Sequence, residues 1–396
     1  MGWTTSLRFG CETDCKTYPR DCISENLVRR IADRMKNDGW VELGYNHLVL
    51  DDCWSAKKRD PRTQRLELDP ERFPGGIESL QNYLKNRGIH LGLSLNYGTV
   101  TCRNYPGSLQ HLEQDAHRLA NWGVEYIKLD SCFSPPDQLE LGSEMFANYL
   151  KDTHRPVVFG CTYPAYINWT SDYNLLDWDK LVQVCDSWRW SPPTDGSWRA
   201  VRDTLNLYKR HVYQLQLAAY EKHWNDFDAL ALGNYGLSDD QKRVQMGMWC
   251  MHGSPLMISA DFDTLDPVSK ELLRNKNLIA INQDDLNYPS VPVTRTGENI
   301  QFWIRQLKSI PSTVGALTII NMNSGGITVS FAFSMRTVFS VLPHAPSGYS
   351  KLIDAFTGTE FAVVSNHQKV TVPVNPNGIV LYLIQPVLNG TRENCH

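Results

Sequence analysis

Short apolar segments alternate with longer segments of helical periodicity from the N-terminus to about residue 285. The helical segments include Ser24–Asp38, which opens on a capping serine, and Leu109–Trp122. The segments predicted to be strands are Ser6–Gly10, His47–Asp52, His90–Asn96, Tyr126–Cys132, Val157–Cys161, Val182–Trp188, Trp224–Leu230 and Pro255–Asp261. Because this alternation is typical of βα units around a parallel sheet, the sequence predicts a (β/α)8 TIM barrel over residues 1–287.

The hydrophobic period changes to two after Asn282-Gln283-Asp284, as in Gln301–Arg305 and Ile327–Phe333. Turn sequences interrupt this region at 323–326, 346–348 and 375–378, and the last run, Ile379–Ile384, has the composition of a buried strand. The pattern predicts a second, C-terminal domain over residues 288–396, an antiparallel β-sandwich.

Polar or ionisable residues stand at the ends of several predicted barrel strands. They are Asp51, Asp52, Asn96, Asp130, Thr162, Arg189 and Asp228. The carboxyl ends of barrel strands meet at one mouth, where active sites of this fold lie. The strand ends therefore predict a polar site at that mouth.

Size and charge narrow the class of protein. The chain has 396 residues and a formal net charge of -4, so no basic surplus favours nucleic acid or an anionic membrane. No apolar run reaches the roughly 18 residues of a membrane span. Met1-Gly2-Trp3 does not open a signal peptide, which we expect to have been removed or to lie outside this sequence. A neutral ligand fits these properties best.

The chain has 10 cysteines, several of them crowded near the N-terminus. Disulfides in a secretory protein are the leading interpretation, and the alternative of a zinc site lacks CxxC or HxxxH spacing. Two N-glycosylation triplets, at Asn168 and Asn389, are compatible with the same route.

The segment Tyr126–Cys132 carries the most specific local chemistry. Strand alternation places Lys128 and Asp130 on the same face, at the strand end. Because a neighbouring lysine favours the ionised form, Asp130 is suited to attack an anomeric carbon and form a glycosyl-enzyme intermediate. The alternative is a structural Lys–Asp pair.

A series of short motifs follows in order along the predicted barrel. They are Gly2-Trp3, Cys22–Glu25, Asp51–Trp54, Arg72–Ile77, Lys128–Asp130, Trp188-Arg189, Trp224–Asp226 and Ile281–Asp284, with a weaker match at Asn375–Gly378. Together they resemble glycoside hydrolase family 27, the α-galactosidases and α-N-acetylgalactosaminidases. The resemblance implies retaining removal of terminal α-linked galactose or N-acetylgalactosamine without a cofactor or metal. It also implies a homodimer in a lysosomal or extracellular location.

The same resemblance assigns roles to the strand ends. Asp130 is the expected nucleophile. The expected sugar contacts are Asp51, Asp52, Lys128, Tyr166, Arg189 and Asp228, a mixture of acceptors and donors that suits a hydroxyl-rich ligand. Thr162 and Ala165 match the pair of positions that separates the two activities, and their small side chains favour N-acetylgalactosamine over galactose. For each residue the alternative is a buried structural polar group.

One part of the family pattern is missing. The family's acid/base aspartate lies between Trp-Arg and Ser-Trp, and this chain keeps both anchors, Trp188-Arg189 and Ser197-Trp198, at the same spacing. The acid/base position falls on Pro193, which can neither donate a proton nor activate water. Asp195 is the nearby candidate for a substitute.

Other pocket positions also depart from the family pattern. Ser6, Ser94, Asn96 and Ala229 stand where the family has an aromatic residue, a tyrosine, an aspartate and a methionine. Two hypotheses follow. One is a weak or inactive glycosidase that retains Asp130, and the other is a non-catalytic glycan-binding or structural protein. A transglycosylase would need the same missing acid.

The resemblance also implies disulfide pairs. They are Cys11–Cys53, Cys15–Cys22, Cys102–Cys132 and Cys161–Cys185. Cys250 is then most simply a buried free thiol, and Cys395, near the end of the chain, could bridge to another chain.

Overall fold

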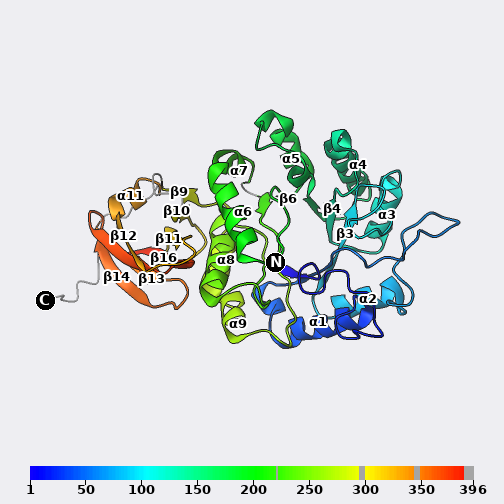
Figure 1. Cartoon of the computed structure of the whole chain (residues 1–396), viewed down its shortest axis with the longest axis horizontal. Helices are drawn as coiled ribbons and strands as arrows, with labels where there is room; N and C mark the ends of the chain where they lie inside the picture. Colours follow the sequence, from blue (N-terminus) through cyan, green and yellow to red (C-terminus); the bar gives the residue numbers. More distant parts are fainter. Residues whose placement is uncertain (220–221, 294–298, 343–347, 388–396) are drawn as a thin grey trace. The chain divides into compact units, whose positions relative to one another are not determined.

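The computed structural model describes residues 1–219, 222–293, 299–342 and 348–387, which form two compact units (Figure 1). The first unit comprises Met1–Ala200, His223–Gly236 and Pro255–Asp266. The second comprises Val201–Lys222, Leu237–Ser254 and the described residues from Pro267 onward. These units interleave along the chain, so the domain boundary expected between residues 287 and 288 stays a prediction.

The first unit contains an 8-stranded parallel sheet in the order β7-β6-β5-β4-β3-β2-β1-β8. Its strands are β1 (Gly2–Thr4), β2 (His47–Leu50), β3 (His90–Asn96), β4 (Tyr126–Asp130), β5 (Val158–Cys161), β6 (Ser187–Arg189), β7 (Trp224–Asp226) and β8 (Met257–Ile258). A parallel bridge between Leu230 and Ile258 joins the ends of this order into a ring. The predicted (β/α)8 barrel is confirmed.

Helices α1 to α5 lie outside the strands of this unit (Figure 1). Their bounds are α1 (Glu25–Asn37), α2 (Gly76–Lys85), α3 (Leu112–Asn121), α4 (Leu139–Asp152) and α5 (Trp178–Val184), and short 3-10 helices cover Val41–Leu43, Pro136–Gln138, Tyr163–Tyr166 and Tyr173–Leu175. Helix α1 begins as predicted, because the Ser24 side chain accepts a hydrogen bond from the Leu27 amide. Its buried side chains, among them Val28 and Ile31, form one stripe.

Two strand predictions were wrong. Residues 6–10 form a turn, because the amides of Phe9 and Gly10 both donate to the Thr5 carbonyl, and the first strand is Gly2–Thr4. Residues 182–184 belong to α5, whose start is capped by the Asp177 side chain on the Lys180 amide. In both segments, local hydrogen bonds override an apolar composition that is compatible with a strand.

The second unit contains antiparallel strands. They form a six-stranded sheet in the order β14-β13-β16-β11-β10-β9 and a two-stranded sheet, β12-β15. The strands are β9 (Val291–Pro292), β10 (Ile300–Gln306), β11 (Gly315–Asn321), β12 (Val329–Ser334), β13 (Tyr349–Asp354), β14 (Glu360–Ser365), β15 (Lys369–Val374) and β16 (Gly378–Pro386). Side chains from both sheets, including Phe302, Leu317, Phe333 and Val372, form one core. The antiparallel C-terminal domain is confirmed.

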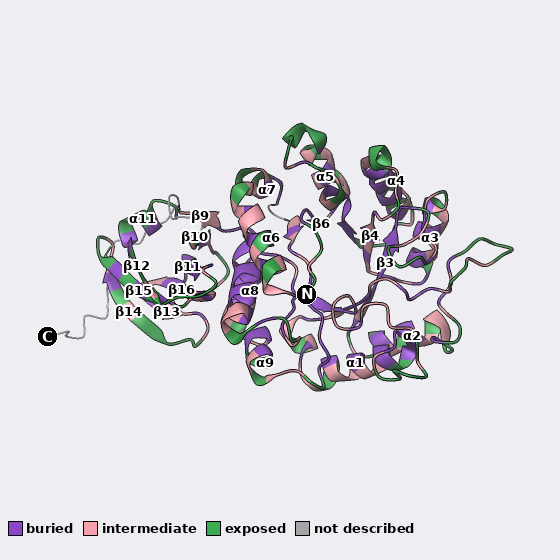
Figure 2. Cartoon of the chain, in the orientation of Figure 1, coloured by how far each residue is buried: buried purple, intermediate pink, exposed green. Residues whose placement is uncertain are grey.

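Helices also belong to the second unit. They are most of α6 (Trp198–Arg210), then α7 (Val212–Ala218), α8 (Asp239–His252), α9 (Pro267–Leu273), α10 (Lys276–Asn282) and α11 (Met335–Phe339). Helix α8 packs against β16 and is buried over most of its surface (Figure 2). A capping box of Ser238 and Gln241 starts α8, and Gly253 in the left-handed conformation ends it.

All the predicted disulfides are present: Cys11–Cys53, Cys15–Cys22, Cys102–Cys132 and Cys161–Cys185. Cys250 is a buried free thiol, as predicted, and burial raises its pKa. Asn168 is exposed, whereas Asn389 and Cys395 lie outside the described residues. Within the described ranges, no helix combines the length and the apolar composition needed to cross a membrane.

Candidate active site

Several polar strand ends pair in register across neighbouring barrel strands. Pairing sets Asn96 opposite Asp130 and sets Arg189 opposite Asp226. Thr162 follows Cys161, which pairs with Leu129 on one side and Trp188 on the other, so Thr162 continues the register between Asp130 and Arg189. The register therefore brings together residues from β3 to β7 that are far apart in sequence.

Lys128 links two carboxylates at the centre of the mouth. Its ammonium group lies 2.6 Å from Asp51 Oδ1 and 3.4 Å from Asp130 Oδ2. Burial disfavours the charged form of Asp51, but the Lys128 charge and hydrogen bond outweigh it and lower the pKa of Asp51. Burial also opposes the charge of Lys128, yet Asp130 and Asp51 raise its pKa well above the ordinary value. Asp51 and Lys128 thus remain an ion pair.

Arg189 contacts the nucleophile candidate from the other side. Its guanidinium group lies 3.5 Å from Asp130 Oδ1 and 3.7 Å from Asp228 Oδ2. Burial disfavours the charge, but Asp130 and then Asp228 outweigh this and raise the pKa of Arg189. Asp130 therefore has a cation beside each of its two oxygens, and its role as nucleophile stays a prediction.

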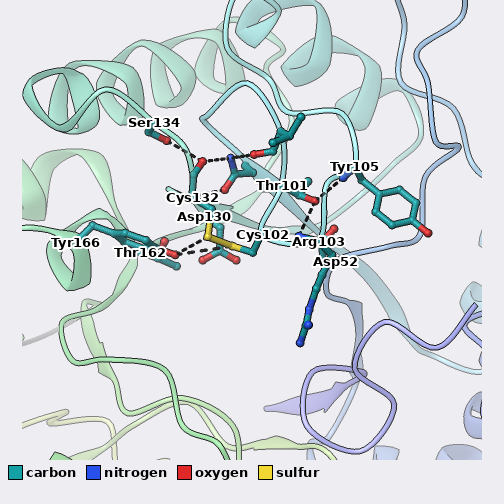
Figure 3. Close-up of a disulfide and its surroundings, with 12 residues drawn as sticks. Asp52, Thr101, Cys102, Arg103, Tyr105, Asp130, Cys132, Ser134, Thr162 and Tyr166 are labelled. Atoms are coloured by element: carbon teal, nitrogen blue, oxygen red, sulfur yellow. Dashed lines mark hydrogen bonds between the residues drawn. A yellow bond between two sulfur atoms is a disulfide. The ribbon is translucent and has the colours of Figure 1, made fainter.

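A disulfide forms another part of the mouth (Figure 3). Cys102–Cys132 joins the loop after β3 to the end of β4, and the Tyr166 hydroxyl lies 3.3 Å from Cys132 Sγ. Gly98 permits this packing, because a Cβ there would lie 2.0 Å from the Cys132 carbonyl oxygen. The same loop supplies the Arg103 amide, which donates to Asp52 Oδ2 at 3.0 Å. The disulfide thus fixes the loop that holds Asp52.

Asp52 differs electrostatically from Asp51. Burial raises the pKa of Asp52, although hydrogen bonds from the Thr101 side chain and the Cys53 amide act in the opposite direction. Unlike Asp51, it has no salt bridge to Lys128 among the described residues. Asp52 therefore accepts mainly from neutral donors.

The two positions expected to set specificity behave differently. Thr162 is buried, and its hydroxyl donates to the Leu129 carbonyl at 3.1 Å. Ala165 is half-buried, and Tyr166 is 41% exposed. Burial, followed by the Asp130 charge, raises the pKa of Tyr166. The Thr162 hydroxyl proton is thus already engaged by the backbone.

Two of the positions expected to depart from the family pattern, Ser94 and Asn96, make hydrogen bonds at this mouth. Ser94 Oγ donates to Asp51 Oδ1 at 2.8 Å. The Asn96 amide donates to the Val100 and Cys132 carbonyls and accepts from the Cys132 amide. Of the other two, Ser6 lies in the turn after β1, and Ala229 is buried. Ser94 and Asn96 are therefore integrated into the hydrogen bonding of the site.

The segment around Pro193 is largely exposed. Pro192 and Pro193 are exposed, and the Thr194 amide donates to Asp228 Oδ2 at 3.0 Å. Asp195 is exposed and accepts from the Ser197 amide at 2.9 Å, just before α6. Hydrogen bonds from the Ser197 side chain and amide lower the pKa of Asp195. A general acid needs the opposite shift, so these contacts argue against Asp195 as the substitute.

Asp226 was not among the predicted site residues. It ends β7 and is half-buried, whereas its neighbours Asn225 and Phe227 are both buried. Burial and then the charge of Asp228 raise the pKa of Asp226 to about 6. Strand alternation could have identified it, because Asp226 precedes the predicted contact Asp228 by two residues. No group of three or more metal-ligating side chains occurs within the described ranges.

Comparisons with known proteins give the same architecture. Residues 1–284 match the family model described as alpha galactosidase A. The chain is 36% identical to alpha-N-acetylgalactosaminidase of Gallus gallus, over 98% of this chain and 93% of the relative, and 35% identical to human alpha-galactosidase A, over 85% and 77%. The structure of alpha-galactosidase I from Mortierella vinacea shares the fold, with a TM-score of 0.84, 24% identity and coverage of 99% and 98%.

Proposed function

The chain belongs to glycoside hydrolase family 27, the α-galactosidases and α-N-acetylgalactosaminidases, and on this premise we propose that it hydrolyses terminal α-linked N-acetylgalactosamine or galactose. The observation that carries the proposal is Asp130, which lies at the mouth with Lys128 and Arg189 on its two oxygens. The small residues Thr162 and Ala165 favour N-acetylgalactosamine.

In this proposal the reaction proceeds by double displacement. An Asp130 oxygen bonds to the anomeric carbon as the glycosidic bond breaks, and water later releases the sugar, so the configuration is retained. Asp51, Asp52, Lys128 and Arg189 offer acceptors and donors to the sugar hydroxyls. Tyr166 and Asp228 complete the contacts with the sugar.

The acid step is the weak point of the proposed reaction. Pro193 occupies the position of the family's acid, and loss of general acid help costs on the order of 10² to 10⁴ in rate. The loss is greatest for poor leaving groups such as another sugar. We therefore expect slow hydrolysis of natural glycans and faster hydrolysis of activated aryl glycosides.

A second candidate function is glycan binding without cleavage. The exposed Pro192-Pro193 segment and the hydrogen-bonded Asp195 favour it, because neither supplies a proton donor. The sugar-holding groups Asp51, Lys128 and Arg189 do not depend on that segment.

Further properties complete the proposal. The disulfides fit the secretory pathway, and we propose a lysosomal or extracellular location, a homodimer, and a division into domains at residues 287/288. No nucleic acid or cofactor is required.

The test is hydrolysis of aryl α-N-acetylgalactosaminide and aryl α-galactoside by the wild-type chain and by Asp130→Asn. We expect release of the phenol, reduced in the variant by on the order of 10⁴ or more. Calorimetric titration with N-acetylgalactosamine measures binding of the sugar, and together with the turnover assay it distinguishes the hydrolase from the glycan-binding protein. Binding with no turnover above Asp130→Asn would contradict the hydrolase and support the glycan-binding protein.

A further inference from the structure

The Ser94 side chain contacts a carboxylate of the proposed sugar site directly. Ser94 is among the residues expected to depart from the family pattern, and its Oγ donates to Asp51 Oδ1 at 2.8 Å. Only 6% of its surface is exposed, and a hydroxyl has a single proton to donate. Ser94 therefore acts on a ligand at the mouth through Asp51.

Adjacent strands bring two donors to the same oxygen of Asp51. Strands β3 and β4 run parallel, and Ser94 pairs in register with Lys128. The Lys128 ammonium group donates to Asp51 Oδ1 at 2.6 Å, the oxygen that Ser94 also contacts. Asp51 Oδ1 is thus occupied by a hydroxyl from β3 and a cation from β4.

The other oxygen of Asp51 keeps its capacity to accept. Among the described residues, every side-chain hydrogen bond to Asp51 ends on Oδ1. The Asp51 amide donates to the Thr5 hydroxyl at 2.9 Å, which holds the backbone, and 22% of the Asp51 side chain is exposed. Because a carboxylate accepts at both oxygens, Oδ2 is the atom of Asp51 that can accept from a ligand.

Ser94 supplies a constraint that Lys128 alone does not. The Lys128 ammonium group, on a flexible stem, is shared with Asp130 Oδ2 at 3.4 Å. The Ser94 hydroxyl is one bond from its Cβ, and the Trp54 indole donates to the Ser94 carbonyl at 2.9 Å, so its backbone is held as well. The terminal torsion of an aspartate is broad, and rotation of the Asp51 carboxylate would break both contacts on Oδ1. Ser94 therefore helps to fix the direction of Oδ2.

We propose that Ser94 is a positioning residue for sugar binding, whose hydroxyl holds Asp51 Oδ1 so that Oδ2 accepts from one hydroxyl of the sugar. The role rests on the proposed function, because it requires N-acetylgalactosamine or galactose at the mouth. A carboxylate that is already oriented loses less freedom when the sugar binds, and the affinity for the sugar is higher for that reason.

The test is calorimetric titration with N-acetylgalactosamine and with analogues that each lack one hydroxyl of the sugar. For Ser94→Ala we expect Kd for the parent sugar to rise by about 5- to 20-fold. With the analogue that lacks the hydroxyl bound by Asp51, Ser94→Ala should raise Kd by less than about 2-fold, because the coupled hydrogen bond is absent. A purely structural residue would affect all analogues alike.

A pair of variants of nearly equal shape separates the hydroxyl from the volume of the side chain. Ser94→Thr keeps the donor and should bind within about 3-fold of wild type, whereas Ser94→Val should lose affinity by about 5- to 20-fold, as Ser94→Ala does. The pair also tests the role if Ser94→Ala fails to fold. Thermal unfolding shows which variants are folded.

Ser143→Ala is the matched control for loss of a buried hydroxyl. Ser143 lies in α4, is buried, and donates to the Leu139 carbonyl at 2.9 Å, so its removal should leave Kd unchanged. Equal affinity of Ser94→Thr and Ser94→Val, or an equal loss on every analogue, would overturn the role of Ser94. Failure of wild type to bind any of these sugars would also overturn it, and turnover compared with Asp130→Asn decides separately whether the hydrolase stands.

Discussion

The two sides of the barrel mouth differ in how their carboxyl groups are held. On the β2–β4 side, Lys128 bridges Asp51 and Asp130. On the β6–β7 side, Asp195 faces solvent at the start of α6, and Asp226 is desolvated beside Asp228. The first arrangement presents the charged groups of the proposed sugar site, and the second includes the segment at Pro193, where the proposed reaction lacks its acid. The proposed sugar contacts and the expected acid position thus lie on different segments, so substitutions can test them separately.

The largest expected effect comes from placing a carboxyl group at Pro193, the position at which the proposed reaction lacks its acid. Pro193→Asp should raise kcat/KM for glycosides with weakly acidic leaving groups by on the order of 10² to 10⁴, because it returns a carboxyl to the family's acid position. Pro193→Ala is the matched control, since it removes the ring without adding an acid. Equal rates for the two variants would show that the loop no longer reaches the glycosidic oxygen.

Removal of the Cys102–Cys132 disulfide should have the next largest effect. The sequence separation is 30 residues, so Cys102→Ser with Cys132→Ser should lower the free energy of unfolding by about 3 to 4 kcal/mol. Affinity for N-acetylgalactosamine should also fall, because the same loop supplies the Arg103 amide to Asp52.

Removal of Cys15–Cys22, with a separation of 7 residues, is the matched control for that measurement. It should cost only about 2 kcal/mol and leave sugar affinity unchanged. Denaturant unfolding and calorimetry measure the two quantities. Equal loss of affinity in both double variants would contradict a specific role for the loop at the mouth.

Asp226→Asn should change stability in a pH-dependent way. Burial and the neighbouring Asp228 charge raise the pKa of Asp226 in the folded chain from the ordinary 3.8 to about 6, so the ionised carboxylate destabilises the fold increasingly as pH rises from about 4 to 6. The variant should therefore be more stable than wild type at pH 7.5 by at most about 3 kcal/mol. Near pH 3.5 the two should unfold alike in a thermal scan, and a stability difference that persists there would refute the titration.

Asp195→Asn should have the smallest effect. Its carboxylate is exposed and accepts the Ser197 amide, which an asparagine oxygen can also accept, so we expect a loss below about 1 kcal/mol near neutral pH. The lowered pKa of Asp195 means that its contribution is present above the ordinary aspartate pKa and is lost as pH falls through the folded value. A larger loss at low pH than at pH 7 would contradict this assignment.

Periodicity predicted the parts of the fold whose side chains meet a core. Strand His90–Asn96 has the predicted bounds, and Lys128 and Asp130 share a face because pleating alternates side chains. The strand predictions for residues 6–10 and 182–184 were wrong. Turn and helix hydrogen bonds determine the structure of these segments, and neither kind of bond leaves a clear hydrophobic period in the sequence.

The candidate site was predictable only where a motif or a strand end marked it. The disulfide pairs followed from resemblance, whereas the desolvation of Asp226 depends on neighbours from other strands. The capping of the Ser197 amide by Asp195 likewise needs coordinates.

The position of β1 has a consequence for how the chain assembles. β1 pairs with β2 on one side and with β8 on the other, and the Trp3 indole donates to the Ala260 carbonyl, 257 residues away in sequence, at 2.8 Å. During synthesis Ala260 emerges long after Trp3. The ring of strands therefore stays open after its earlier strands have been made. Such distant pairing slows folding, and until closure the free edges of β1 and β8 can pair with other chains. Substitutions at Trp3 should therefore reduce the yield of folded protein more than the rate of its chemistry.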